Sequence, residues 1–314
     1  MKLNLNFSSK LLLGMAAGLA AALIGGSWQV VTRQSTTTNL GPGDLVWLRY
    51  FIPALVLLPL TWRTGLLPQG VPRRWLALMV FGSGLPFGLL AMTGSRYAPT
   101  AHMGVLIAGA APLFVALFAW LLFSERPDRW RATGLGFMAV GAALLGFKTL
   151  AGTALQGVWR GDLLFTLAAV LWACFTLSFR RSGLTPWQGA ALVNTWSALL
   201  LLPWLCWLLW HGEFQLFNAP LPDLIWQALW QGVLAGLLGL WTFNVAIRRL
   251  GAAPAAAFGA LAPVVSALGG WWWLGEEMTA MDVLAVACAM VGVALASGLL
   301  SERITSGQKF KATS

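Results

Sequence analysis

Long apolar segments, each about the length of a membrane-spanning helix, follow one another along almost the whole chain. A helix needs roughly 20 apolar residues to cross a hydrocarbon core about 30 Å thick, and the connections between these segments are short and polar. The pattern predicts ten membrane-spanning helices. Their ranges are 11–31, 45–62, 75–94, 99–123, 130–147, 162–179, 186–210, 223–247, 252–274 and 279–299.

Composition supports an integral membrane protein with no room for a soluble domain. Of the 314 residues, 58% are hydrophobic and only 10% are charged, against about a quarter in ordinary soluble proteins. The first apolar segment follows Lys2 and Lys10 and could imitate a secretory signal peptide. Because nine further spans follow it, we expect an uncleaved first helix.

The net charge of +10 indicates membrane topology rather than nucleic-acid binding. With ten spans, both termini lie on one side of the membrane. If that side is the cytoplasm, all but five Lys and Arg residues fall in cytoplasmic segments, where basic residues concentrate. The exceptions are Arg33, Arg49, Arg96, Lys148 and Arg160. We therefore expect a multi-pass protein of a bacterial-type inner membrane, with both termini cytoplasmic and the lipid bilayer as a partner.

A pattern of residues in one half of the chain recurs in the other half. Pro112 and Glu125 recur 151 positions later as Pro263 and Glu276. Five spans per half is an odd number, so the second half must enter the membrane from the opposite side. The predicted fold is an all-α membrane protein of ten helices in two inverted five-helix repeats, an arrangement typical of transporters. The predicted parts are a first repeat (1–148), a linker (149–161), a second repeat (162–300) and a cytoplasmic tail (301–314).

Short motifs in both halves carry a resemblance to a known family. They are Leu48-Arg49-Tyr50, Ala111-Pro112 with Ser124-Glu125, and Ala262-Pro263 with Gly275-Glu276. With these motifs the chain resembles the EamA branch of the drug/metabolite transporter (DMT) superfamily. Its aromatic richness and length are most similar to the YddG-type aromatic amino-acid exporters of that branch. The resemblance implies a ten-helix basket in which helices one to four and six to nine line a central cavity.

Residues that occur in both halves face opposite sides of the membrane, which favours a structural or gating role over ligand binding. Glu125 and Glu276 each lie at a helix corner, where a carboxylate accepts hydrogen bonds from exposed N–H groups and faces a helix N-terminus. Pro112 and Pro263 each remove one backbone hydrogen bond, and the resulting kink shapes a cavity or a gate. Sequence does not separate these two roles of the prolines.

Two ionisable residues without a counterpart in the other half are candidates for binding substrate. Arg49 lies about five residues inside the second span, where a charge usually faces the bundle interior. Since this depth is about 7 Å, snorkelling to the surface is the structural alternative. His102, in the first turns of the fourth span, either meets a substrate or titrates, or is a hydrogen-bonded interfacial residue.

Polar and aromatic residues near mid-span complete the candidate cavity. Indole N–H groups and amides are costly to expose to lipid and need partners there. The tryptophans are Trp28, Trp172, Trp196 and Trp241, and the amides are Gln29, Asn194 and Asn244. Helix–helix hydrogen bonding is the alternative for the two asparagines.

Residue types that are absent from the predicted spans disfavour several classes of function. No span carries an acidic residue near its middle, which disfavours proton-driven export of cationic drugs. Only Arg49 is a candidate cavity cation, which disfavours carriers of phosphorylated metabolites. No metal-ligand cluster, phosphate-binding loop or nucleophile elbow occurs, so we predict no catalytic residue, metal or other cofactor, and an intramembrane enzyme is a remote alternative.

The function expected from the sequence is export of neutral, chiefly aromatic, amino acids or related small metabolites by alternating access. The alternatives are DMT exporters of other drugs or metabolites and phosphorylated-metabolite carriers. The expected partners are a small-molecule substrate and the bilayer, with no nucleic acid.

Overall fold

A computed structural model describes most of the chain. The described ranges are 3–38, 40–151, 156–212, 215–251, 255, 258–259 and 261–296, with side chains from residue 11 onward. These ranges contain helices and their connections and no strand. The predicted tail 301–314, the first residues of the ninth predicted span and the last residues of the tenth lie outside them.

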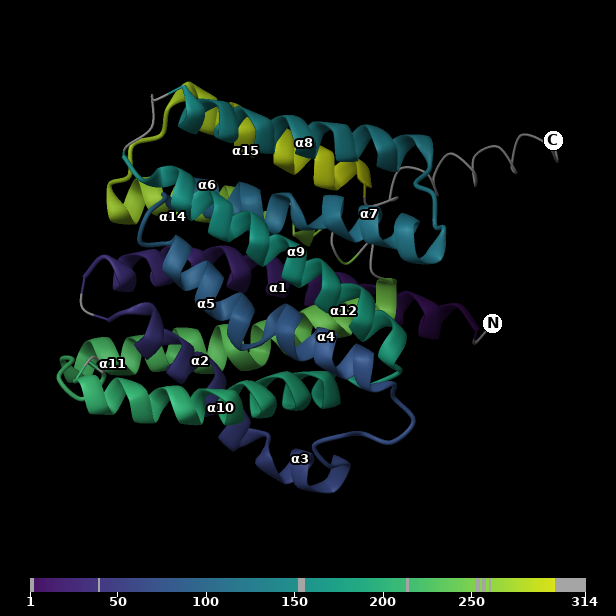
Figure 1. Cartoon of the computed structure of the whole chain (residues 1–314). Helices are drawn as coiled ribbons and strands as arrows, with labels where there is room; N and C mark the ends of the chain where they lie inside the picture. The colour runs from purple at the N-terminus through teal and green to yellow at the C-terminus, as the bar shows by residue number, and fades with distance from the viewer. Residues whose placement is uncertain are drawn as a thin grey trace, which may run out of the picture.

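The helices follow the apolar segments closely (Figure 1). In chain order they are α1 (Leu3–Thr36), α2 (Pro42–Val56), α3 (Leu58–Thr64), α4 (Arg73–Ser83), α5 (Leu85–Gly94), α6 (Thr100–Met103), the π-helix η1 (Gly104–Gly109), α7 (Ala111–Phe123), α8 (Arg129–Leu150), α9 (Val158–Ser182), α10 (Pro186–His211), α11 (Leu221–Gln227), the π-helix η2 (Ala228–Gly239), α12 (Leu240–Leu250), α14 (Leu261–Leu274) and α15 (Ala280–Ala296).

Seven helical segments in the described part are long and apolar enough to cross a membrane. They are Leu11–Thr36, Arg73–Gly94, Thr100–Phe123, Arg129–Leu150, Val158–Ser182, Pro186–His211 and Leu221–Leu250. Counting α2 and α3 as one bent span makes up to eight, and α14 and α15 are shorter apolar helices. The expected all-helical, multi-pass membrane protein is confirmed.

Three of the predicted spans are broken rather than continuous. The axes of α2 and α3 differ by 64°, α4 and α5 are separate helices that meet at Gly84, and the fourth span passes from α6 through η1 into α7. Each time the next helix carries a proline in its first turn. The prolines are Pro59, Pro86 and Pro112. Because proline lacks an N–H and its ring clashes with the preceding turn, these positions interrupt the helix.

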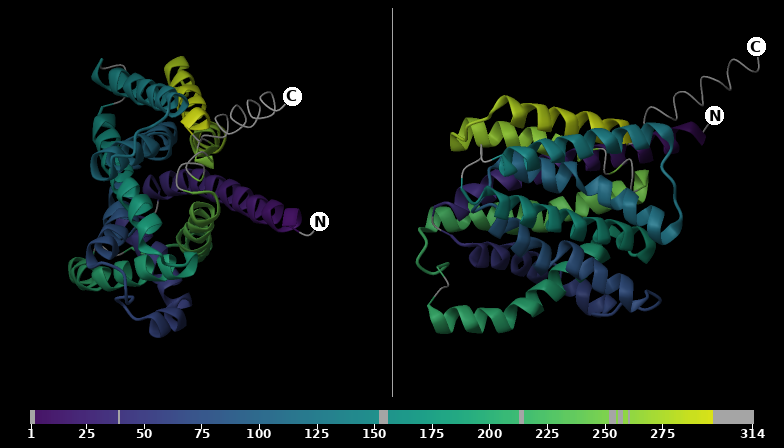
Figure 2. Two further views of the ribbon diagram at one scale, coloured as in Figure 1. Left: turned by 90° about the vertical axis from the view of Figure 1, so that its right-hand side faces the viewer. Right: turned by 45° about the horizontal axis from the view of Figure 1, so that its top comes forward.

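At one edge of the molecule α8 packs along α15 (Figures 1 and 2). A Cβ on Gly134 would collide with backbone atoms of Gly292 and Ala296, and a Cβ on Gly141 would crowd the carbonyl of Ala285. Because these glycines have no side chain, the two helix backbones can approach closely, as small residues allow between membrane helices. Away from this pair, α1 packs against α12, α14 and η2.

Candidate functional site

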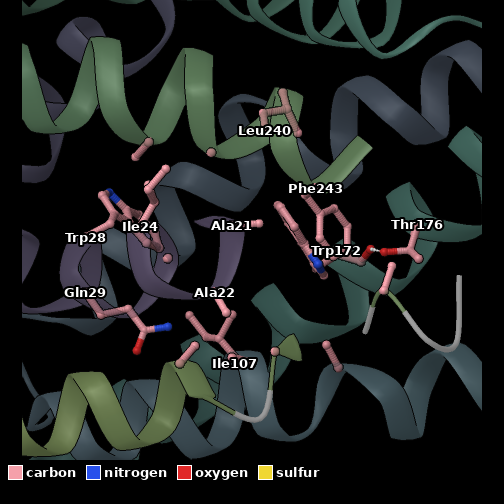
Figure 3. A pocket seen from close by; sticks show the side chains of 18 of the residues that line it. Ala21, Ala22, Ile24, Trp28, Gln29, Ile107, Trp172, Thr176, Leu240 and Phe243 are labelled. Carbon is pink, nitrogen blue, oxygen red and sulfur yellow. Dashed lines mark hydrogen bonds between the residues drawn. The ribbon is translucent and has the colours of Figure 1, made fainter. Parts of the chain in front are cut away.

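A cavity of about 930 Å³, including its open mouth, lies between α1, η1, α7, α9 and α12 (Figure 3). Along α1 it extends from Gly18 to Gln29, about 16 Å at 1.5 Å per residue. Beyond Gln29, Val31 and Thr32 are fully buried. The cavity therefore runs from the middle of the molecule toward the end where α1 begins, and is closed toward the end where α1 finishes.

Aromatic rings form part of the cavity wall. The ring of Trp172 lies 5.1 Å, centre to centre, from Phe87 and 5.1 Å from Phe243. Phe87 in turn lies 6.2 Å from Trp28. These separations are within the range in which aromatic pairs attract one another. Figure 3 shows Trp28 at one end of the view and Trp172 beside Phe243 toward the other. A planar apolar group of a ligand could therefore pack against several rings of this wall.

One buried guanidinium faces this wall. Arg49 is only 6% exposed, and its Cζ lies 4.3 Å from the centre of the Trp28 ring. Among the described residues, Nε and Nη1 of Arg49 have no hydrogen-bond partner, and no Asp or Glu of this part of the chain lines the cavity. Because an unpaired buried charge is costly, the cavity is suited to an anionic group beside a flat apolar body.

Close packing of α2 against η2 places Arg49 at the cavity. A Cβ on Gly232 would lie 2.9 Å from the carbonyl oxygen of Leu48, and one on Gly236 would collide with that of Arg49. The Asn194 Nδ2 also donates to the carbonyl of Gly236 at 3.2 Å. Two glycines one helical turn apart thus let the α2 backbone approach, which brings the arginine inside the bundle instead of toward lipid.

Two glutamines hold Trp28 in place. The Nε1 of Trp28 donates to Gln231 Oε1 at 2.6 Å, and the Nε2 of Gln231 donates to Gln227 Oε1 at 3.2 Å and Thr32 Oγ1 at 3.1 Å. The neighbouring Gln29 lines the cavity, and its buried Oε1 has no hydrogen-bond partner within the described ranges. The closed end of the cavity therefore carries both a cation and a free acceptor.

Comparison with known proteins identifies the family of this chain. The model of the EamA-like transporter family matches the chain twice, over residues 12–147 and 159–298. The chain belongs to the EamA-like transporter family. It is therefore a multi-pass membrane transporter, and a small-molecule substrate follows from that class.

Individual relatives of this EamA-like transporter agree with that assignment. It is 24% identical over 256 residues to the "Uncharacterized transporter YyaM" of Bacillus subtilis, covering 79% of this chain and 81% of the relative. It is 25% identical over 226 residues to the "Probable amino-acid metabolite efflux pump" of Salmonella typhimurium, covering 69% and 74%. A crystal structure matches 94% of this chain and 97% of its own with a TM-score of 0.59 and 22% identity, which shows likeness of fold.

The cavity of this EamA-like transporter contains several of the residues singled out from sequence. They are Trp28, Gln29, Arg49, Trp172 and Pro112. Asn194 and Asn244 instead bridge helices: their Nδ2 atoms donate to the carbonyls of Gly236 and Pro186, each at 3.2 Å. These contacts match the helix–helix alternative considered for both residues.

The tryptophans divide between the cavity and the helix surfaces. The ring of Trp241 stacks on Trp187 at 4.9 Å and is not among the residues that line the cavity. The Nε1 of Trp196 donates to the carbonyl of Leu66 at 2.8 Å. Of the mid-span tryptophans, Trp28 and Trp172 alone line this cavity in the described part of the protein.

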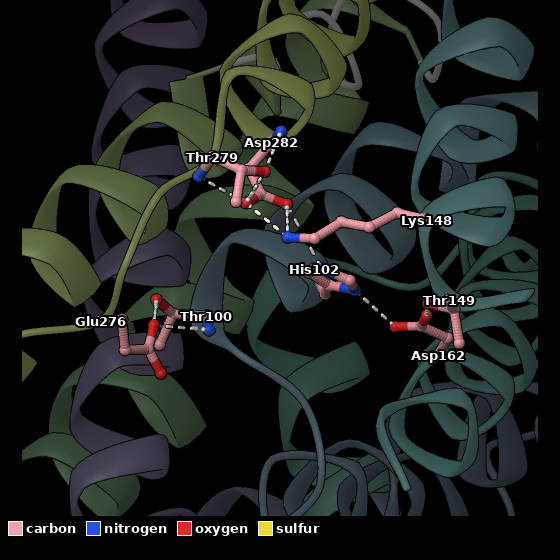
Figure 4. A network of polar contacts seen from close by, with 8 residues as sticks. All are labelled: Thr100, His102, Lys148, Thr149, Asp162, Glu276, Thr279 and Asp282. Carbon is pink, nitrogen blue, oxygen red and sulfur yellow. Dashed lines mark hydrogen bonds and ion pairs between the residues drawn. The ribbon is translucent and has the colours of Figure 1, made fainter. Parts of the chain in front are cut away.

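His102 lies in a buried ionic cluster rather than on the cavity wall (Figure 4). Its Nδ1 lies 2.7 Å from Asp162 Oδ1 and its Nε2 3.5 Å from Asp282 Oδ1. The Nζ of Lys148 donates to both oxygens of Asp282, at 2.8 and 2.7 Å, and Thr149 Oγ1 donates to Asp162 at 2.7 Å. The cluster joins the first turns of α6, α9 and α15 to the end of α8.

The two repeated glutamates have different partners. Glu125 accepts two hydrogen bonds from Arg180, at 2.7 and 3.1 Å, and the Arg180 guanidinium lowers the pKa of the Glu125 carboxyl below its ordinary value. Glu276 accepts from Arg33 Nε at 3.0 Å and from Thr100. The expected contact between a corner carboxylate and a helix N-terminus is present at Glu276.

Several residues that line the cavity were not predicted from the sequence. Phe87, Phe243 and Thr176 line the cavity, but they resemble many other apolar or small residues in their spans. Gln227 and Gln231, which position Trp28 but do not line the cavity themselves, did leave a signal. They lie four positions apart in a largely apolar stretch, a spacing that brings two side chains together on one helix.

Proposed function

We propose that this transporter exports neutral, chiefly aromatic, amino acids or related small metabolites across a bacterial inner membrane by alternating access. The observation that carries the proposal is the guanidinium of Arg49, whose Nε and Nη1 have no hydrogen-bond partner in the described structure, in a cavity walled by aromatic rings. A cation of this kind favours a substrate with one carboxylate. The name of the Salmonella relative, which refers to amino-acid metabolites, supports the same class.

Each part of an aromatic amino acid has a counterpart in the cavity. The carboxylate would accept from Nε and Nη1 of Arg49, a charge-assisted contact. The ammonium would donate to Gln29 Oε1, the second buried atom without a partner in the described structure. The side chain would lie against Trp172 and Phe243. A phosphorylated metabolite is less well matched, because Arg49 is the sole cation among the described lining residues.

The transport mechanism we propose rests on two inverted five-helix repeats with ten crossings. The family model matches once in each predicted half, and α14 and α15 supply apolar helices where the ninth and tenth crossings are expected. With both termini in the cytoplasm, the end where α1 begins is the inner end. The cavity then faces the cytoplasm in this conformation, ready to load an export substrate.

Counterflow in proteoliposomes that contain only this protein tests the assignment. The panel consists of phenylalanine, tryptophan, tryptamine, glutamate and a sugar phosphate. We expect phenylalanine and tryptophan to exchange and tryptamine, which lacks the carboxylate, not to compete. Equal exchange of glutamate or the sugar phosphate, or no exchange of the aromatic amino acids, would refute the aromatic assignment and leave the family assignment intact.

A further inference from the structure

Two helix ends, one in each half of the chain, have the same backbone conformation. At the end of α7 the N–H of Glu125 donates to the carbonyl of Ala119 at 3.2 Å, and at the end of α14 the N–H of Glu276 donates to that of Gly270 at 3.0 Å. The residue before each glutamate is left-handed: Ser124 has φ 55° and Gly275 has φ 66°. In both corners a left-handed residue at the helix end lets the following N–H turn back to the helix, as at a C-cap, and the two glutamates occupy matching positions.

The two carboxylates nevertheless lie in different surroundings. Glu276 Oε2 accepts from the backbone N–H of Thr100 at 2.9 Å and from its Oγ1 at 2.6 Å (Figure 4), and its side chain is 14% exposed. Glu125 is 43% exposed. Its described side-chain partners are two arginines of α9, Arg180 and Arg181. Glu276 is bound to the start of a second helix, whereas the described side-chain partners of Glu125 are the half-buried Arg180 and the exposed Arg181.

The contact at Glu276 joins three elements at the closed end of the cavity. Thr100 is the first residue of the span Thr100–Phe123, where backbone N–H groups lack partners within the helix and attract a carboxylate. Arg33, near the end of α1, donates to the other carboxylate oxygen and to the carbonyl of Ser95. Further along, these same helices line the cavity at Pro112 and Ala262.

A glycine makes this contact possible. Gly270 lies on α14 one turn before its end, and a Cβ there would overlap both Thr100 Oγ1 and Glu276 Oε2. The start of α6 therefore approaches α14 only because position 270 has no side chain. This is a packing requirement independent of charge.

From these contacts we infer that Glu276, Thr100 and Gly270 form a latch that closes the cavity at the end where α1 finishes. The latch must open before substrate can leave at that end. Glu125, the matching corner at the opposite end, has no such contact in the described structure, in keeping with the cavity extending toward its end. The inference concerns the transport cycle and holds for any substrate.

Cysteine labelling in membrane vesicles tests the latch. In a full-length chain without its native cysteines, Ala262→Cys reports on the cavity and is exposed to a membrane-impermeant thiol reagent. The reagent is applied on the side from which a Glu277→Cys chain is labelled. We expect slow labelling in the parent and labelling about tenfold faster in Glu276→Gln, because the neutral amide makes weaker hydrogen bonds than the carboxylate and closes the cavity for a smaller share of the time. The matched change Glu125→Gln should leave the rate unchanged.

Gly270→Ala separates the latch from a general effect of charge. It keeps every ionisable group and should also accelerate labelling from the latch side. If Glu276→Gln does not accumulate in the membrane, the labelling rate of Gly270→Ala alone shows whether the latch closes the cavity. Rates within twofold of the parent in both variants, or equal acceleration by Glu125→Gln, would overturn the inference. Because labelling needs no substrate, failure of the aromatic assignment would leave this test unaffected.

Discussion

The Cζ of Arg49 lies 4.3 Å from the centre of the Trp28 ring, so in the described part of the chain the guanidinium rests on an aromatic face, and no ion pair to a carboxylate holds it there. A cation–π contact orients the guanidinium without neutralising its charge. Its Nε and Nη1 are left for a ligand.

Arg49→Gln should weaken the apparent affinity for phenylalanine by about 10- to 100-fold, because hydrogen bonds to a charged group are worth about 1.5–3 kcal/mol. Counterflow in proteoliposomes measures the effect. Arg63→Gln removes an exposed arginine and should have no effect. Equal affinities in the Arg49 variant and the parent would exclude Arg49 as the carboxylate anchor.

Trp172→Ala should reduce protection of cells against toxic phenylalanine or tryptophan analogues, with unchanged protein levels. Loss of one aromatic contact of about 0.5–1.5 kcal/mol corresponds to roughly a two- to thirteenfold weaker interaction. Trp241→Ala is the matched control, since that ring stacks on Trp187 outside the cavity. If both variants lost protection equally, the effect would come from helix packing and not from the cavity wall.

Membrane topology is tested by labelling single cysteines from outside the cell. Glu277→Cys and Arg126→Cys replace exposed residues beside the two repeated corners, in a chain without native cysteines. With inverted repeats and cytoplasmic termini, the reagent should modify position 277 and spare position 126. The opposite pattern would overturn the assigned orientation.

Substrate-driven flux should survive collapse of the pH gradient by an ionophore. No acidic residue in the described structure lines the cavity, and His102 is engaged by Asp162 and Asp282. His211→Ala, which changes the other histidine, is the control for His102→Ala. Flux that stops with the gradient, together with a pH dependence of flux that disappears in His102→Ala alone, would make His102 the coupling site.

His102→Ala should also destabilise the fold by about 3 kcal/mol, because two buried carboxylates would lose the group between them. Thermal unfolding in detergent measures this loss. An unchanged midpoint would show that the cluster adds nothing to stability.

The ion pair of Glu125 should make a small, pH-dependent contribution to stability. Arg180 lowers the pKa of the folded carboxyl from its ordinary value of 4.5. The stabilisation is therefore complete above about pH 4.5 and is lost as the pH falls through the lower folded value. The pair is exposed, so its contribution should stay below about 1 kcal/mol. The unfolding midpoints of Glu125→Gln and the parent should differ slightly at pH 7 and converge in acid; a gap that widens in acid would contradict this sign.

The sequence by itself determined the class of protein and the local shape of its helices. Apolar segments of spanning length, with few charges, have no stable place outside a bilayer, and this determined an all-helical membrane protein. Prolines at 59, 86 and 112 interrupt their spans for a local steric reason. Ser124 and Gly275 precede the two repeated glutamates, and both corners close with the same C-cap because that geometry depends only on neighbouring residues.

Tertiary structure alone decided which side chains face the cavity and which contacts the repeated corners make. The sequence does not show which neighbouring helix each face will meet, so Trp172 and Trp241 could not be told apart before packing placed one in the cavity and the other on Trp187. Likewise Glu125 and Glu276 have the same local backbone. Glu276 accepts the N–H of Thr100 only because α6 docks on α14, a contact between residues 176 positions apart in the chain. Glu125 has no such contact in the described structure and stays exposed. Local sequence does not show which distant element will dock on either corner.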